Sequence, residues 1–363
     1  MRFHSLPSNS LLVVLTGAVD DNSVKISEVV LNLVNRSVAR VLVGDPLCND
    51  ETWLRSNLQS TVSVGMTCRD ITRFPRILRP LIYRWLPSHK ILMQSFEIAK
   101  EKLVATLRNR DDSEKNANVL RWLIDANGKQ EFNPDISFLT NQILFLGTAA
   151  TRSTAVTIVN ALLDLAAYPE HQATLRGEIN DVLAMKEGWS LAAIREMKKL
   201  DSFLKESQRL NNHLLLSFNR KVRLSFTLSS GVKIPVGTFI SMPAYWAARE
   251  SDDLAGLDEV FRPWRWCELR ERAEKQGESP IPYLARTPNQ NNLHWGYGRN
   301  ACPGRFLADA EAQLLLAWIV WNYEVRLPPG QTKRPENLFI GERVIPDPSQ
   351  MLVLKRCRTK QQS

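Results

Sequence analysis

Residues 294–308 read HWGYGRNACPGRFLA, and this stretch decides the fold that the sequence predicts. It places one cysteine, Cys302, in a glycine-rich loop that is followed by Pro-Gly and by an amphipathic helix over about 304–325. Glycines at 296, 298 and 304 allow a tight backbone path that can press against a flat macrocycle. The dipole and the free N–H groups of a helix start would stabilise a thiolate there and tune its electron donation. Each of these features has a physical role if Cys302 is an iron ligand.

Two other interpretations apply to the same loop. A cysteine chosen at random is most often a buried structural residue, and this alternative stays open for Cys302. Residues 296–301 also match G-x-G-x-x-A, a dinucleotide-binding fingerprint that should follow a buried strand and open a βαβ unit. Here the polar stretch 287–293 precedes the match and no βαβ pattern follows, so we discard it.

The loop resembles the haem-binding signature of the cytochrome P450 family, the haem-thiolate monooxygenases, whose pattern is F-x-x-G-x-[RH]-x-C-x-G. Trp295 takes the Phe place, and Cys302 takes the place of the axial iron ligand. Gly298 and Gly304 take the two glycine places, and residues 303–308 match an extension that many fungal members carry. The resemblance therefore implies that Cys302 binds haem iron.

The same resemblance implies contacts with the haem propionates. Asn300 departs from the pattern, because its place usually holds the Arg or His that makes such a contact. Arg299 is the adjacent basic candidate, although it would point in a different direction. Arg220 lies where the family has another propionate-binding arginine, and an exposed arginine at a strand edge is the alternative.

Three charged residues form a second match, in the family's order along the chain. Glu206 and Arg209 make the E-x-x-R pattern, and their spacing puts both charges on one helix face. Taken alone, this spacing is common, and a solvated pair is the ordinary interpretation. Arg265, in the segment FRPWRW over 261–266, completes the family's set. The resemblance implies a buried triad behind the thiolate, of a kind that specifies structure more than it stabilises.

A long apolar segment over 136–167 predicts one helix through a large domain. Its residues 149–154, AATRST, lie where the family has its oxygen-activation helix. The match puts Ser153 at the family's alcohol position with Thr154 next to it, and we expect one of them to line the oxygen pocket. Arg152 takes the place of an acid, but it stays charged and cannot donate protons in the same way. A polar kink in a core helix is the alternative.

The rest of the chain has mostly helical patterns and a few short strand signals. We predict a mainly α, single-domain fold over 1–363 with small β regions, because no linker is long enough to divide the chain. Helices are expected over 26–43, 191–211 with a break near 200–201, and 304–325; strands over 221–228 and 232–241; a loop over 268–292; and a hairpin over 344–356.

Composition argues against several classes of protein. The 363 residues carry 47 Lys and Arg against 38 Asp and Glu, a net charge of +9, but the basic residues are scattered, which argues against nucleic acid as a partner. The five cysteines are widely spaced without a C-x-x-C, so neither a disulfide framework nor a zinc site is expected. The longest apolar run, 314–321, is far too short to span a membrane.

The resemblance runs from about residue 20 to the end of the chain and implies a form lacking the N-terminal portion. Full-length fungal members begin with a membrane-anchor helix, a proline-rich hinge, a first β region and a helix bearing W-x-x-x-R. We find none of these patterns before residue 20. We expect membrane association in a full-length form, at the cytosolic face of the endoplasmic reticulum membrane.

The function that the resemblance implies is that of a haem b-dependent oxidoreductase. This monooxygenase would insert one oxygen atom of dioxygen into a lipophilic small molecule, with electrons from a separate NADPH-cytochrome reductase. A weaker resemblance of this chain to fungal members implies a role in secondary-metabolite biosynthesis of terpenoids, meroterpenoids or indole-diterpenes. Two alternatives stay open: a truncated, catalytically inactive remnant of the family, and a basic binding module without haem.

Overall fold

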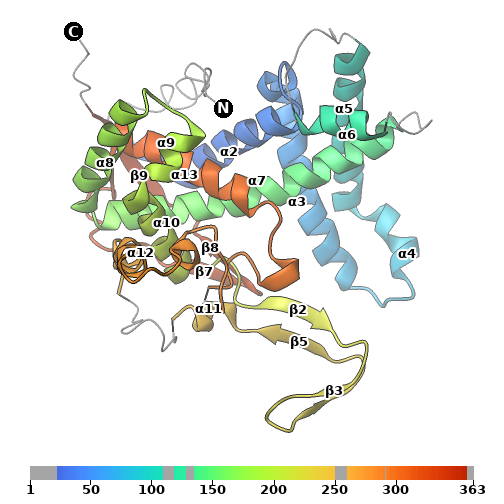
Figure 1. Cartoon of the computed structure of the whole chain (residues 1–363). Helices are drawn as coiled ribbons and strands as arrows, with labels where there is room; N and C mark the ends of the chain where they lie inside the picture. Colours follow the sequence, from blue (N-terminus) through green and yellow to red (C-terminus); the bar gives the residue numbers. More distant parts are fainter. Residues whose placement is uncertain (1–22, 109–117, 128–134, 250–259, 291, 358–363) are drawn as a thin grey trace. The chain divides into compact units, whose positions relative to one another are not determined.

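The computed structural model describes residues 23–108, 118–127, 135–249, 260–290 and 292–357. The chain divides into two compact units, one of residues 31–153 and the other of residues 1–30 and 154–363. Helices dominate and the sheets are small, as Figure 1 shows, which confirms the mainly α prediction. Within the described residues, no helix combines the length and the apolar character that crossing a membrane requires. The single domain over 1–363 stays a prediction.

The unit of residues 31–153 is built around α3 (Glu51–Thr72) and α5 (Pro87–Arg108), which pack against each other. Asp50 joins the two helices, because its carboxylate accepts a hydrogen bond from the Trp53 amide at 2.8 Å and pairs with Lys102 at 2.7 Å. The remaining elements of this unit are most of α2 (Ile26–Leu42), α4 (Arg79–Ile82), α6 (Val119–Asn127), the first part of α7 (Ile136–Ala167), and the 3₁₀ helices η1 (Leu47–Asn49) and η2 (Tyr83–Trp85).

A tight contact between α3 and α7 gives a stability prediction. The buried Asn57 side chain donates a hydrogen bond to Asn35 Oδ1 at 2.6 Å, and a Cβ added at Gly147 would lie 2.4 Å from Asn57 Oδ1. Gly147→Ala should therefore lower the free energy of unfolding by about 1–2 kcal/mol, because overpacking outweighs the gain in helix propensity. Urea denaturation measures the change.

The control for this prediction is Gly65→Ala in α3. No atom lies within 4 Å of the Cβ position at Gly65. That variant should gain up to about 1 kcal/mol from helix propensity alone. Equal effects of the two substitutions would contradict the contact with Asn57.

The other unit packs its helices around α13 (Arg305–Asn322), which contacts α8 (His171–Met185), α9 (Leu191–Glu196) and α10 (Lys198–Leu210). Leu204 and Leu316 are fully buried between these helices, and so is Leu162 from the last part of α7. The smaller helical elements are α11 (Ala244–Ala247), α12 (Arg265–Lys275), η3 (Ile281–Tyr283) and η4 (Gly298–Asn300).

The described residues of this second unit form four small antiparallel sheets. The largest has the strand order β1-β9-β6, with β1 (Ser23–Lys25), β9 (Met351–Arg356) and β6 (Tyr323–Arg326). Three strand pairs make up the rest: β2 (Ser217–Lys221) with β5 (Phe239–Met242), β3 (Phe226–Thr227) with β4 (Lys233–Ile234), and β7 (Asn337–Ile340) with β8 (Arg343–Pro346).

Most helix boundaries follow the sequence pattern, whereas several other local predictions were wrong. The strands expected over 221–228 and 232–241 are each interrupted, since only 221, 226–227, 233–234 and 239–241 of these ranges are in strands. The helix break expected near 200–201 occurs at Met197, between α9 and α10. The loop expected over 268–292 begins as a helix that ends at Lys275, because some of its charged side chains are buried in ion pairs that the polar pattern conceals. The hairpin expected over 344–356 is not formed, since β8 pairs with β7 and β9 with β6 and β1.

Candidate functional site

Cys302 lies in the turn between η4 and α13, three residues before the helix begins at Arg305. Its amide donates a hydrogen bond to the Trp295 carbonyl at 2.7 Å, and its carbonyl accepts one from Arg305 Nη1 at 2.8 Å. Gly296 and Gly298 have φ angles of +71° and +63°, a conformation that residues with side chains rarely adopt. The glycines and the two hydrogen bonds together fix the backbone on both sides of the thiol.

The Cys302 thiol is free and half-buried, next to a loop surface with exposed apolar side chains. Tyr297 and Phe306 are 42% and 57% exposed. A Cβ placed on Gly304 would make an ordinary contact with Cys302 Sγ at 3.9 Å. Arg299 is exposed, and so is its neighbour Asn300. The thiol is thus partly accessible, in a loop that also carries exposed apolar side chains.

The donor set at this position fits a metal held by a macrocycle. Among the described residues, no group of three or more His, Cys, Asp or Glu side chains could hold a metal ion. Cys302 offers one thiolate ligand, and a haem iron needs no more than this from such a loop, because the ring supplies four further ligands. The residues present fit haem with a single thiolate ligand.

The three predicted triad residues meet at the carboxylate of Glu206, whose side chain is fully buried. Glu206 Oε1 lies 2.8 Å from Arg209 Nη2 and 3.4 Å from Arg265 Nε. It also accepts a hydrogen bond from the Arg262 amide at 3.1 Å. Glu206 Oε2 accepts two more, from Arg209 Nε at 3.0 Å and from Trp266 Nε1 at 2.9 Å. One buried acid therefore joins α10 to the start of α12.

Two of the other predicted site residues, Arg220 and Ser153, make local contacts. Arg220 lies in β2, with its guanidinium 4.3 Å from the centre of the Phe218 ring. The Ser153 hydroxyl donates to the Ala149 carbonyl at 3.2 Å. The Thr154 hydroxyl is buried and has no hydrogen-bond partner among the described residues, which is rare for a buried polar atom. The roles of Arg220, Ser153 and Thr154 stay predictions.

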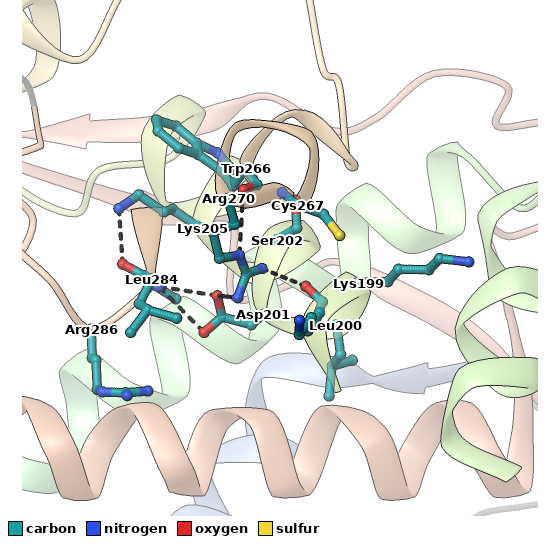
Figure 2. Close-up of polar contacts among 12 residues, drawn as sticks. Lys199, Leu200, Asp201, Ser202, Lys205, Trp266, Cys267, Arg270, Leu284 and Arg286 are labelled. Carbon is teal, nitrogen blue, oxygen red and sulfur yellow. Dashed lines mark hydrogen bonds and ion pairs between the residues drawn. The ribbon is translucent and has the colours of Figure 1, made fainter. Parts of the chain in front are cut away.

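Sequence reasoning missed a second cluster of buried charges, which Figure 2 shows beside α13. Asp201 and Lys205 of α10 are 4% and 0% exposed, and Arg270 of α12 is 5% exposed. Arg270 Nη1 lies 3.0 Å from Asp201 Oδ2. Burial, together with the charge of Asp201, raises the pKa of Asp309 in α13 to about 7. One feature of the sequence could have indicated this cluster: Asp201 and Lys205 are four residues apart in the helix that carries E-x-x-R, so they lie on one helix face.

Lys205 gives a pH prediction. Burial lowers the pKa of Lys205 to about 7, against the attraction of Asp201. Above about pH 7 and up to about pH 10, the unfolded chain therefore binds a proton that the folded chain does not, and stability rises with pH. Relative to Lys205→Met, the free energy of unfolding of the wild type should rise by up to about 1.4 kcal/mol per pH unit in this range. Urea denaturation at several pH values measures the difference.

The matched control is Lys198→Met in the same helix. The Lys198 side chain is 49% exposed and pairs only loosely with Glu274, at 3.9 Å. Its substitution should leave the pH dependence of stability as it is in the wild type. If the difference between the wild type and Lys205→Met were flat from about pH 7 to about pH 10, the lowered pKa of Lys205 would be wrong.

Comparisons with known proteins found relatives that match most of this chain. The chain is 36% identical over 345 residues to a cytochrome P450 monooxygenase of Emericella nidulans, covering 93% of this chain and 63% of that protein. It is 34% identical over 335 residues to an ent-kaurene oxidase of Fusarium fujikuroi, covering 92% of this chain and 62% of that protein. The chain therefore spans less than two thirds of the length of these curated relatives.

A solved structure and a family description complete the comparison. The retinoic acid bound form of cyanobacterial CYP120A1 has a TM-score of 0.70 and 16% sequence identity, over 97% of this chain and 74% of that chain. At this identity the likeness concerns the fold alone, and it confirms the predicted fold class. Residues 8–353 match the family model described as cytochrome P450. The chain belongs to the cytochrome P450 family.

Proposed function

We propose that this chain acts as a monooxygenase that oxidises a lipophilic small molecule in fungal secondary metabolism. The observation that carries the proposal is the free, half-buried thiol of Cys302, in a tight glycine loop at the start of α13. Similarity to ent-kaurene oxidases supports a terpenoid as the substrate class. Because the chain spans 63% of its relative in Emericella nidulans, the activity of the whole protein is part of the proposal.

The family and the fold are those of haem-thiolate enzymes, whose cofactor is haem iron. When bound, haem supplies the activation of dioxygen, and the protein supplies binding and orientation. Cys302 would hold the iron through its thiolate, which the start of α13 favours electrostatically. Trp295 and Arg299 of the loop and Arg220 of β2 would contact the macrocycle or its propionates. The hydroxyl of Ser153 or Thr154 would hold a proton in the oxygen pocket.

The electron donor in this proposal is an NADPH-cytochrome reductase, since members of this family generally draw electrons from a separate redox partner. The place of action is the cytosolic face of the endoplasmic reticulum membrane, where fungal relatives of this kind are generally anchored. Neither the reductase nor the membrane contact is needed for haem uptake. The cofactor and the partners can therefore be tested one after the other.

The first experiment is a spectrum of the full chain with haem added. The reduced protein with carbon monoxide should show the strongly red-shifted Soret band of thiolate ligation. Turnover is then assayed with NADPH, a fungal reductase and ent-kaurene as the probe, using isotope-labelled dioxygen and mass spectrometry. A product carrying one labelled oxygen atom supports the proposal.

The alternatives give different results in the same experiments. Haem uptake without turnover of any lipophilic probe would support an inactive remnant of the family. A chain that takes up no haem would contradict the proposal. If such a chain bound nucleic acid or anionic vesicles with a steep salt dependence, it would be a basic binding module.

A further inference from the structure

The segment 281–285 is held by hydrogen bonds from α10, and Figure 2 shows the bond from Lys205 to Leu284. Lys205 Nζ donates to the Pro282 carbonyl at 2.9 Å and to the Leu284 carbonyl at 2.8 Å. The Asp201 carboxylate accepts from the Ala285 amide, at 3.3 Å to each oxygen. Two side chains one helical turn apart thus fix three of the backbone groups of this segment.

The same segment holds the loop that carries the thiol. The Ala285 carbonyl accepts a hydrogen bond from the Trp295 indole Nε1 at 2.8 Å. The Trp295 carbonyl in turn accepts the Cys302 amide at 2.7 Å. A continuous path of hydrogen bonds therefore runs from Asp201 to Cys302. The phenylalanine of the family signature has no N–H, so the link to Ala285 depends on the indole that this chain carries at 295.

Asp201 is itself held from two further helices. Arg270 Nη1 of α12 lies 3.0 Å from Asp201 Oδ2, and Gln313 Nε2 of α13 donates to Asp201 Oδ1 at 3.1 Å. Gln313 Nε2 also donates to Asp309 Oδ2 at 2.9 Å. Because α13 starts three residues after Cys302, the carboxylate of Asp201 ties both flanks of the thiol loop to α10.

Lys205 is a well-placed donor for this arrangement. Its ammonium lies 4.7 Å from the centre of the Trp266 ring. Asp201 and Asp309 favour its positive charge, whereas Arg270 opposes it. The two bonds to the carbonyls need only two N–H groups, which a lysine keeps with or without its charge.

We propose that Asp201 and Lys205 are positioning residues for Cys302, acting through segment 281–285 and the Trp295 indole. The two side chains set where the Ala285 carbonyl lies, the indole follows that carbonyl, and the Trp295 backbone places the Cys302 amide. The inference rests on the proposed function only where it treats Cys302 as the iron ligand. The order of the loop can be measured whether or not the chain turns over a substrate.

The test compares three variants of the full chain by hydrogen exchange at the Cys302 amide. Trp295→Phe keeps an aromatic ring and removes the indole N–H, and Asp201→Asn weakens the acceptor. Trp295→Phe should speed exchange at Cys302 by roughly threefold to tenfold, which is what the loss of one net hydrogen bond amounts to. Asp201→Asn should speed it by at least as much, because it also removes the carboxylate that pairs with the buried Arg270. The double variant should exchange no faster than the faster single variant, because both substitutions cut one path.

The matched control is Asp164→Asn. Asp164 is 2% exposed and accepts a hydrogen bond from Ser207 of α10 at 2.5 Å, so it is as buried as Asp201 and bonds the same helix. Its other partners are Asn211 and Arg334, which lie on a different path from segment 281–285. Asp164→Asn should lower stability and leave exchange at Cys302 within about twofold of the wild type.

A spectroscopic readout separates positioning from mere stability. In the haem-loaded chain, Trp295→Phe should lower the fraction of the carbon monoxide complex that absorbs at the thiolate position, and Asp164→Asn should not. Unchanged exchange and an unchanged spectrum in Trp295→Phe would overturn the inference, as would equal effects of Asp164→Asn. A wild-type chain that takes up no haem would overturn the proposed function, whereas the exchange experiment would still test the path.

Discussion

Replacing Glu206 by glutamine should lower the free energy of unfolding by about 3–5 kcal/mol. Glu206 is fully buried and is the carboxylate that Arg209 and Arg265 share, within 2.8 Å and 3.4 Å. Both arginines are less than a tenth exposed, so neither can recover its lost partner from water. Glutamine has nearly the same shape as glutamate and leaves no cavity. The decrease in the free energy of unfolding therefore reports the loss of the negative charge. Urea denaturation of the full chain measures the effect.

An exposed ion pair supplies the control for Glu206→Gln. Glu324 and Arg326 lie 2.6 Å apart with side chains that are 36% and 53% exposed. Glu324→Gln should change the free energy of unfolding by less than about 1 kcal/mol, because water screens and replaces the pair. A loss in Glu206→Gln no larger than in Glu324→Gln would mean that water reaches the network around Glu206.

Replacing Cys302 by alanine should abolish the thiolate-type Soret band of the reduced carbon monoxide complex. Cys302 is a free thiol in the turn before α13, and its amide is fixed by the Trp295 carbonyl. The folded chain should survive the change, because the side chain is half-buried and the backbone bond to Trp295 does not need sulfur. The measurement is a reduced carbon monoxide spectrum, together with circular dichroism to verify the fold.

The matched control is Cys357→Ala, because Cys357 is also a free, half-buried thiol. This variant should keep the thiolate band at the intensity of the wild type. If Cys302→Ala kept the band and Cys357→Ala lost it, the iron ligand would have been assigned to the wrong cysteine. If both kept it, one of the remaining thiols, at Cys48, Cys68 or Cys267, would be the ligand.

The parts of the site that could be predicted are those that local pattern determines. The helix over 136–167 was predicted to the residue, since its apolar run is long and continuous. The position of Cys302 before a helix followed from Gly298, Gly304 and the apolar spacing after them. The pair formed by Glu206 and Arg209 could be predicted, because side chains three residues apart are neighbours on a helix.

The parts that could not be predicted depend on contacts between distant segments. Asp201 and Arg270 carry charges that are typical of surface residues, yet both side chains are buried. They form an ion pair with each other, which offsets the cost of burying the two charges. The polar composition of 268–275 led to the prediction of a loop, although the segment forms most of α12. The indole of Trp295 gave no signal that it would reach Ala285, since a single side-chain hydrogen bond leaves no periodic trace in the sequence.

The bonds around Asp201 also constrain the order in which the chain can assemble. The Ala285 amide is 84 residues away along the chain, and Gln313 is 112 residues away. Contacts of such long range form only after the intervening chain has closed, at an entropic cost that grows slowly with its length. On a ribosome, α10 emerges well before α13, so Asp201 and Lys205 must stay hydrated until the C-terminal third arrives. The bonds from Asp201 that hold both flanks of the thiol loop can therefore form only after residues 285–313 have been synthesised.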